Sequence, residues 1–177
     1  MADTIRQNEA IPSAYPDAPD TLSTAAAALD ADFIWQRIES YIAHRWTERD
    51  IEWIVEGPGI WNPSLTPATI STVEIWQANA WATVSLDPSP FGGYELPGCG
   101  PYRIAGTVGG GDVPAAVVEA FRRLAEYMAG KAGKPGASSE RIGAGSISLS
   151  HRRSPSWMAE AMQNSGAGDL LRSYRRA

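Results

Sequence analysis

Cysteine and histidine are nearly missing from this sequence of 177 residues. Cys99 is the only cysteine, and the two histidines, His44 and His151, lie far apart along the chain. An intramolecular disulfide is therefore excluded, and a zinc site built from clustered Cys and His ligands is not expected. The residues predict neither a metal nor another cofactor.

Long apolar runs are also lacking. No segment approaches the roughly 18 consecutive apolar residues that a membrane-spanning helix requires. The first residues include Asp3, Arg6 and Glu9, where a signal peptide would have an apolar stretch. We therefore expect a protein that is cytoplasmic or is assembled from the cytoplasm, with no membrane contact.

Recognisable catalytic motifs are the third absence. The glycine-rich stretch at 106–111 lacks the Gly-Lys-Ser/Thr ending of a phosphate-binding loop, and residues 143–145 are not a dinucleotide fingerprint. The serines before His151 have no elbow motif of the kind that presents a nucleophilic serine. We therefore predict that the protein is not an enzyme, and a small hydrolase is the third alternative after the two discussed below.

Charge is distributed unevenly along the chain. Residues 1–56 have 11 acids and 4 bases, residues 57–139 have 6 and 5, and residues 140–177 have 3 and 6. This asymmetry predicts that the basic end contacts an acidic surface or the acidic half of a neighbouring copy. Nucleic-acid binding fits less well, because the acidic body repels phosphates and the arginines form no dense patch.

Composition divides the chain into four parts. Residues 1–20 contain scattered prolines and polar residues with little periodicity, which predicts an N-terminal arm that is extended or disordered. Residues 21–130 form the core. Residues 131–153 are rich in Gly and Ser and predict a flexible linker before a C-terminal arm at 154–177.

The core begins with a helical pattern. Apolar residues recur at helical spacing from Leu22 to Trp46, with Thr21 or Ser23 as the cap, a break near 30–32, and His44 with Arg45 in the last turn. A second helix at 113–129 begins after Asp112 and Pro114 and ends at Gly130.

A β insertion at 50–108 lies between these helices. Asn79 tolerates the left-handed backbone that a hairpin turn requires. The predicted strands are 51–56, 69–77, 81–86, 94–96 and 102–108. The helix, sheet, helix order predicts the α+β class: a helical core with a small inserted antiparallel β region and extended N- and C-terminal arms.

Tryptophan is abundant, with seven residues in the chain. Trp53 alternates with charged neighbours and is assigned to the core. Trp76 lies on the strand face opposite Val73 and Ile75, so we predict a subunit contact there. A tryptophan-rich module that binds carbohydrate or protein is the alternative function.

The C-terminal arm has apolar and basic residues after the linker, where free termini are usually polar. One interpretation is that they are anchors for a partner. The other is that the tail folds back and covers its own core. Both interpretations stay open at this stage. The residues concerned are Trp157, Met158, Met162, Leu170, Leu171, Arg172, Tyr174, Arg175 and Arg176.

Six segments together resemble the head-tail connector, or adaptor, proteins of tailed bacteriophages, especially those of alphaproteobacterial gene transfer agents. The likeness lies in their order and spacing and spans residues 21–177. The segments are Ile42 to Trp46, Glu56 to Gly59, Gly93 to Tyr102, Ala116 to Tyr127, Arg153 to Met158 and Leu170 to Arg176.

The resemblance implies a structural role in viral assembly. Such adaptors form a ring, usually a dodecamer, beneath the capsid portal and above the tail stopper or terminator. The ring forms part of the DNA ejection channel, and double-stranded DNA passes through it without specific binding. The expected location is the head-tail junction of a virion or gene transfer agent particle that is assembled in the bacterial cytoplasm.

The resemblance also implies that the C-terminal segment binds the portal protein. Its apolar residues would be the anchors, and its arginines would contact carboxylates or carbonyls. The expected anchors are Trp157, Met158, Met162, Leu170, Leu171 and Tyr174, and the expected polar contacts come from Arg172, Arg175 and Arg176.

Overall fold

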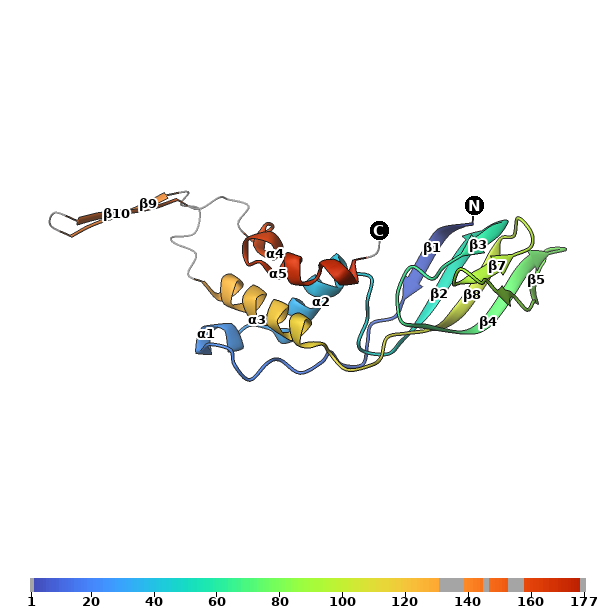
Figure 1. The fold of residues 1–177 in the computed structure, drawn as a ribbon, viewed down its shortest axis with the longest axis horizontal. Helices are drawn as coiled ribbons and strands as arrows, with labels where there is room; N and C mark the ends of the chain where they lie inside the picture. The colour runs from blue at the N-terminus through green and yellow to red at the C-terminus, as the bar shows by residue number, and fades with distance from the viewer. Residues whose placement is uncertain (1, 131–138, 145–146, 153–157, 176–177) are drawn as a thin grey trace. The chain divides into compact units, whose positions relative to one another are not determined.

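The protein has both helices and antiparallel sheets, which confirms the α+β class (Figure 1). This computed structural model describes residues 2–130, 139–144, 147–152 and 158–175. The chain divides into two compact units. Unit 1 consists of residues 1–16, 42–112 and 174–177, and unit 2 consists of residues 17–41 and 113–173.

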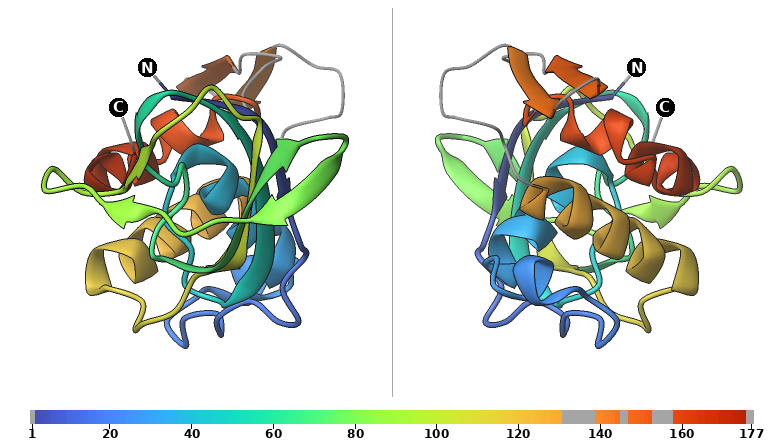
Figure 2. Two further views of the ribbon diagram at one scale, coloured as in Figure 1. Left: turned by 90° about the vertical axis from the view of Figure 1, so that its right-hand side faces the viewer. Right: turned by 90° about the vertical axis from the view of Figure 1, so that its left-hand side faces the viewer.

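Unit 1 contains a five-stranded antiparallel sheet, and Figure 2 shows how strongly its strands curve. The strand order is β1-β2-β8-β4-β5, and a smaller sheet has the order β3-β7-β6. The strands are β1 Asp3–Glu9, β2 Arg49–Glu56, β3 Gly59–Trp61, β4 Ala68–Gln77, β5 Ala80–Thr83, β6 Asp87–Pro88, β7 Tyr94–Leu96 and β8 Tyr102–Val108.

Alternation along β2 and β8 builds the core of unit 1. Every second residue of both strands is buried, as period-two patterning requires when one face of a sheet packs inward. Trp53 has no exposed surface, so its assignment to the core is confirmed. The buried cluster consists of Ile51, Trp53, Val55, Trp61, Leu65, Val73, Leu96, Tyr102, Ile104 and Val108.

The hairpin between β4 and β5 confirms the predicted turn. Ala78 and Asn79 have φ angles of 49° and 62°, the pair of positive values typical of a two-residue type I′ loop.

The two ends of the unit 1 segment 42–112 are hydrogen-bonded to each other, because the Gly110 amide donates to the Trp46 carbonyl at 3.0 Å. Residues 46 and 110 therefore adjoin where the chain enters and leaves this segment.

Unit 2 begins with two helices instead of one. Ser23 caps the first, accepting from the Ala26 amide at 3.2 Å, and Asp30 accepts from the Asp32 amide at 3.0 Å to begin the second. The predicted cap and the break near 30–32 are confirmed. The helices of this unit are α1 Thr24–Ala27, α2 Ala31–Tyr41, α3 Ala115–Ala129, α4 Ala161–Asn164 and α5 Ala167–Leu170, followed by the 3₁₀ turn η1 Arg172–Tyr174.

The prediction that His44 and Arg45 lie in the last helical turn is wrong. Helix α2 ends at Tyr41, and the chain then runs extended beside Thr66. The Arg45 amide donates to the Thr66 carbonyl at 2.9 Å, and the Thr66 amide donates to the Ala43 carbonyl at 2.9 Å. These hydrogen bonds to a distant residue replace the hydrogen bonds of a helix. The periodicity of one segment cannot predict them, because it contains no information about the distant partner.

Helix α3 agrees with the prediction in position and in its apolar face. It begins after Pro114 and ends at Gly130. Hydrogen bonds join α3 to the cap of α1: Glu126 accepts from the Ser23 amide at 2.7 Å and from the Ser23 hydroxyl at 2.8 Å. Its buried residues are Val117, Ala120, Phe121, Leu124, Ala125 and Met128.

Two segments expected to lack regular structure contain strands. Part of the predicted N-terminal arm is β1, which pairs along its length with β2, so pairing overrides the low strand propensity of its Asp, Asn and Gln residues. Within the predicted linker, β9 Ser139–Ala144 pairs with β10 Ile147–Arg152. In β10 apolar residues alternate with serines, a period-two signal that the Gly/Ser content obscures.

Candidate partner-binding surfaces

The C-terminal segment 158–175 packs on helix α3 of unit 2. Helices α4 and α5 both contact α3, and Met162 and Leu171 are buried there. Ala161 and Ala167 between them are also buried. For these positions the tail covers its own core, which was the second interpretation of the sequence. Met162 and Leu171, which the resemblance suggests as anchors, are core residues of unit 2.

The other predicted docking residues of this segment reach the surface. Met158 and Leu170 are half-buried, and Arg172 and Arg175 are exposed. Arg172 forms an ion pair with Asp169 at 3.1 Å, but both side chains are more than three quarters exposed, so the pair adds little stability. Trp157 and Arg176 lie outside the described residues.

Tyr174 joins an aromatic cluster in unit 1. Its ring meets His44 at a centroid distance of 5.8 Å and Trp46 at 5.7 Å, both edge to face. The Ala43 amide donates to the Tyr174 carbonyl at 3.0 Å. Ring contacts and a backbone bond therefore hold residue 174, which makes it a structural contact of unit 1 as well as a predicted docking residue.

The imidazole of His44 is the titratable group of this cluster. Burial, and then the charge of Arg45, lower the pKa of His44 below its usual 6.5. The folded state thus takes up the proton less readily than the unfolded state. The stability linked to His44 is fully present above pH 6.5 and declines once the unfolded state becomes protonated below that value.

We expect the free energy of unfolding to fall between about pH 7 and about pH 5, and His44→Asn to remove part of this slope. Urea unfolding at several pH values measures the effect. His151→Asn is the matched control, because it removes the other histidine. Equal slopes for wild type and His44→Asn would contradict the role given to His44.

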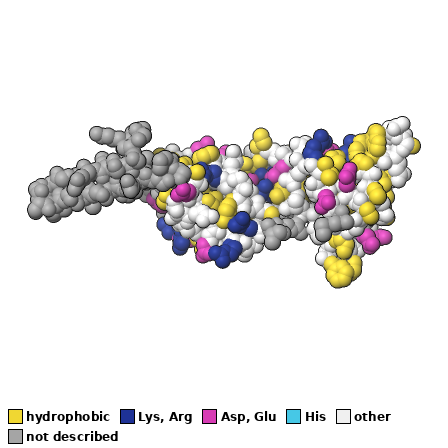
Figure 3. Space-filling model, turned by 90° about the horizontal axis from the view of Figure 1, so that it is seen from above, with side chains coloured by type: hydrophobic (Ala, Val, Ile, Leu, Met, Phe, Trp, Pro, Cys, Tyr) yellow, Lys and Arg dark blue, Asp and Glu magenta, His cyan; other side chains and the backbone are white. Residues whose placement is uncertain are grey.

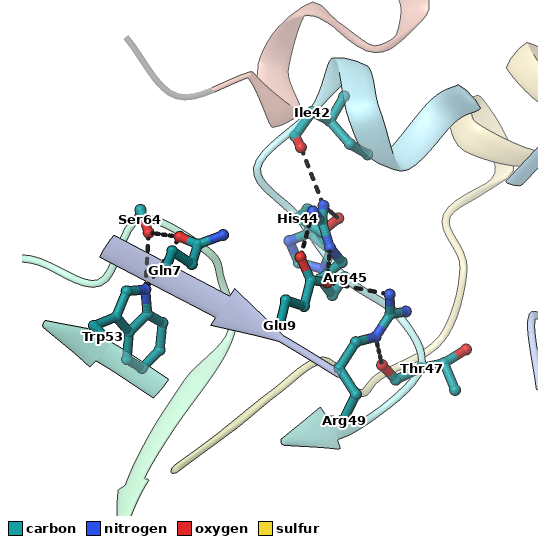
Figure 4. A network of polar contacts seen from close by, with 9 residues as sticks. All are labelled: Gln7, Glu9, Ile42, His44, Arg45, Thr47, Arg49, Trp53 and Ser64. Atoms are coloured by element: carbon teal, nitrogen blue, oxygen red, sulfur yellow. Dashed lines mark hydrogen bonds and ion pairs between the residues drawn. The ribbon is translucent and has the colours of Figure 1, made fainter. Parts of the chain in front are cut away.

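A buried ion cluster links β1 to the start of β2 (Figure 4). Glu9 accepts from Arg45 Nε at 2.6 Å and Nη2 at 3.1 Å, and from Arg49 Nη1 at 3.2 Å. Both arginines are only 7% exposed. Arg45 also donates to the carbonyls of Ile42 and His44. The sequence analysis missed this cluster, because its carboxylate lies within the predicted arm.

A second polar row on β1 faces the core of unit 1. Trp53 Nε1 donates to Gln7 Oε1 at 3.2 Å, and Trp61 Nε1 donates to Thr4 Oγ1 at 2.9 Å. Strand β1 thereby supplies an acceptor to each of these two buried indoles, and Trp53 Nε1 also donates to Ser64 Oγ at 3.0 Å. It is an integral part of the sheet.

Trp76, for which the sequence analysis predicts a subunit contact, lies at an exposed aromatic site. It is 41% exposed and meets Trp81 edge to face at 5.2 Å. The Arg103 guanidinium lies 4.7 Å from the Trp81 ring centroid, and Arg103 Nε donates to Glu74 at 2.6 Å. Trp35, Trp46, Trp53 and Trp61 are buried. Among the described residues, Trp76 and Trp81 are therefore the tryptophans that could stack on a ligand.

The described residues contain no group of three or more His, Cys, Asp or Glu that could hold a metal ion. Within the same ranges no helix is long and apolar enough to cross a membrane. Glu119 has a pKa lowered to about 2 by hydrogen bonds from Arg122 and Arg123, but it lies on the solvent-exposed face of α3. Its perturbation reflects surface ion pairing.

Comparisons with known proteins give one solved structure to report. No protein-family model matches the chain, and no curated protein matches it. The structure is described as "Neck of empty GTA particle computed with C6 symmetry". The match has a TM-score of 0.46 and 14% sequence identity, and it covers 91% of this chain and 95% of the other.

Proposed function

We propose that this protein is a structural adaptor of a phage-like or gene transfer agent particle. In this role it forms a ring beneath the portal and above the tail stopper or terminator, at the head-tail junction. Its main support is the order and spacing of sequence segments that resemble connector proteins, of which 116–127 lies on α3 and 170–176 ends the C-terminal segment. A structural match with a TM-score of 0.46 carries no weight for function.

The C-terminal segment is the part that we propose contacts the portal. Because Met162 and Leu171 are buried in the core of unit 2, they hold the segment in place and do not supply the contact. Contact then falls to the residues that reach the surface and to those outside the described ranges. These are Trp157, Met158, Leu170, Arg172, Arg175 and Arg176.

Negative charge on unit 1 suits a channel for DNA. Strand β2 and its flanks hold Glu48, Asp50, Glu52 and Glu56. Carboxylates repel phosphates, whereas exposed arginines would retain them by releasing counterions. We propose that double-stranded DNA slides past the ring without specific binding.

The test is a pull-down with a portal protein from the same genome. The double variant Arg172→Glu, Arg175→Glu is expected to weaken binding at least tenfold, because charge-assisted hydrogen bonds contribute about 1.5–3 kcal/mol each. Gln163→Ala, an exposed change on the same segment, is the control. Wild-type protein that does not bind the portal, or a double variant that binds as wild type does, would overturn the portal assignment.

A tryptophan-rich binding module is the second candidate, favoured by the exposed Trp76 and its contact with Trp81. Stacking on a sugar or a peptide changes indole fluorescence. A saturable change with a soluble glycan that is lost in Trp76→Ala would support the module. No change in the presence of glycans would remove the carbohydrate-binding form of this candidate.

A further inference from the structure

Helix α2 holds the turn at which the described part of the C-terminal segment begins. The Met158 carbonyl accepts a hydrogen bond from Arg37 Nη2 at 2.9 Å, although the two residues are 121 positions apart in the sequence. Met158 is half-buried, so part of its side chain reaches the surface. Arg37 therefore holds the backbone of a residue that the proposed function assigns to the portal contact.

Interactions within the segment hold this turn only weakly. The Met158 carbonyl also accepts from the Ala161 amide, at the longer distance of 3.3 Å. Helix α4, which begins at Ala161, has four residues, and its N-cap residue Glu160 makes no side-chain capping bond. A helix of about one turn is not stable by itself in water. The turn thus depends on other elements of unit 2, and the guanidinium of Arg37 supplies a charge-assisted hydrogen bond.

The far end of α4 is attached to a different helix. Asn164 Nδ2 donates to the Tyr127 hydroxyl of α3 at 3.3 Å. Met162, between the two attachments in sequence, is buried. The segment therefore has a polar contact with α2 at Met158 and another with α3 at Asn164, and a substitution can remove either one without the other.

Arg37 is not one of the buried residues of its helix. It is half-buried, so its guanidinium can be removed without opening the core. The buried residues of α2 are Ile34, Trp35, Ile38 and Glu39. Figure 3 shows basic and acidic side chains interspersed over the helices of unit 2. Overall charge therefore does not orient a partner on the face shown, and the placement of individual contact residues matters more.

We propose that Arg37 is a positioning residue for portal binding, which holds the Met158 backbone so that the Met158 side chain is presented in one arrangement. The inference rests on the proposed function, because it concerns the same docking segment. Ordering a contact residue before association lowers the entropic cost of binding. Arg37 acts through Met158 and needs no contact of its own with the portal.

The first measurement is the portal affinity of variants of the full chain. Arg37→Met keeps an unbranched apolar side chain but removes the donors, and we expect it to weaken binding about fivefold, because the portal must then order a free side chain. Arg37→Lys should recover most of the affinity, because an ammonium group still donates to a carbonyl. Tyr127→Phe removes the other attachment and should stay within about twofold of wild type. Wild-type affinity in Arg37→Met, or an equal loss in Tyr127→Phe, would overturn the proposal.

Hydrogen exchange in the free chain tests the positioning directly. The Ala161 amide donates to the same carbonyl as Arg37, so its exchange by NMR reports opening of the turn. Arg37→Met should accelerate this exchange roughly tenfold, because the turn opens locally more often. The amide of Leu124, a buried residue of α3, should keep its wild-type rate and shows that the unit remains folded. An unchanged rate at Ala161 overturns the positioning role, even where portal binding is lost, because Arg37 would then contact the portal itself.

The two measurements separate this inference from the proposed function. Wild-type protein that does not bind the portal contradicts the adaptor function, and with it the role of Arg37 in docking. Wild-type binding that Arg37→Met leaves unchanged contradicts the role of Arg37 alone.

Discussion

Removal of residues 154–177 is expected to unfold unit 2. The deleted segment supplies Met162 and Leu171, which are buried in unit 2 together with two alanines, and its helices α4 and α5 contact α3. Without them the buried face of α3 is exposed to water. Truncating one buried leucine to alanine typically costs about 2–5 kcal/mol, and the deletion removes several such side chains at once.

Circular dichroism during thermal unfolding measures this effect. Leu171→Ala is the point variant, and Leu170→Ala, at the half-buried neighbouring position, is the control with the same chemical change. We expect a large loss of stability for the first and a small one for the second. A chain ending at Arg153 that melts as the full chain does would contradict the packing. A truncated chain is therefore unsuitable for the portal test.

Loss of the carboxylate in Glu9→Ala is expected to destabilise unit 1 by about 3–5 kcal/mol. Arg45 and Arg49 are buried, with side chains only 9% and 3% exposed, and Glu9 is the acid that binds both. Removing it leaves two charges in a site of low polarity. Breaking a buried pair from one side costs far more than the pair contributes in total.

Urea denaturation provides the measurement, with the Arg6 and Glu52 pair as the control. That pair is 3.5 Å apart, and its side chains are 69% and 33% exposed. Exposed pairs contribute about 0–1 kcal/mol, so Glu52→Ala should have little effect. If both variants lose the same stability, Glu9 does not compensate a buried charge.

Much of this fold could be predicted because its signals are local. Strands β2 and β8 alternate strictly, and α3 has a continuous apolar stripe between Pro114 and Gly130. The Ala78 and Asn79 turn follows from the conformations that short hairpins require. In each case the residues that specify the element lie within it.

The elements that could not be predicted depend on partners far away in sequence. Strand β1 has weak strand propensity and forms because β2 and the Arg45 and Arg49 guanidinium groups bind it. Likewise the sequence around Leu171 is compatible with an exposed anchor, and only the packing of unit 2 shows that this side chain is buried. Of the candidate site, only Trp76 was singled out from its position opposite Val73 on one strand, and it is exposed while Val73 is buried.

The bond between Gly110 and Trp46 bears on the order of folding. Unit 2 must bring α2 to α3 across the inserted residues 42–112. Closing a flexible loop of that length costs roughly 4 kcal/mol of chain entropy. Once unit 1 has folded, residues 46 and 110 are hydrogen-bonded neighbours, and α2 and α3 are joined by a short connection instead of a long loop. Folding of unit 1 therefore lowers the entropic cost of bringing α2 and α3 together in unit 2.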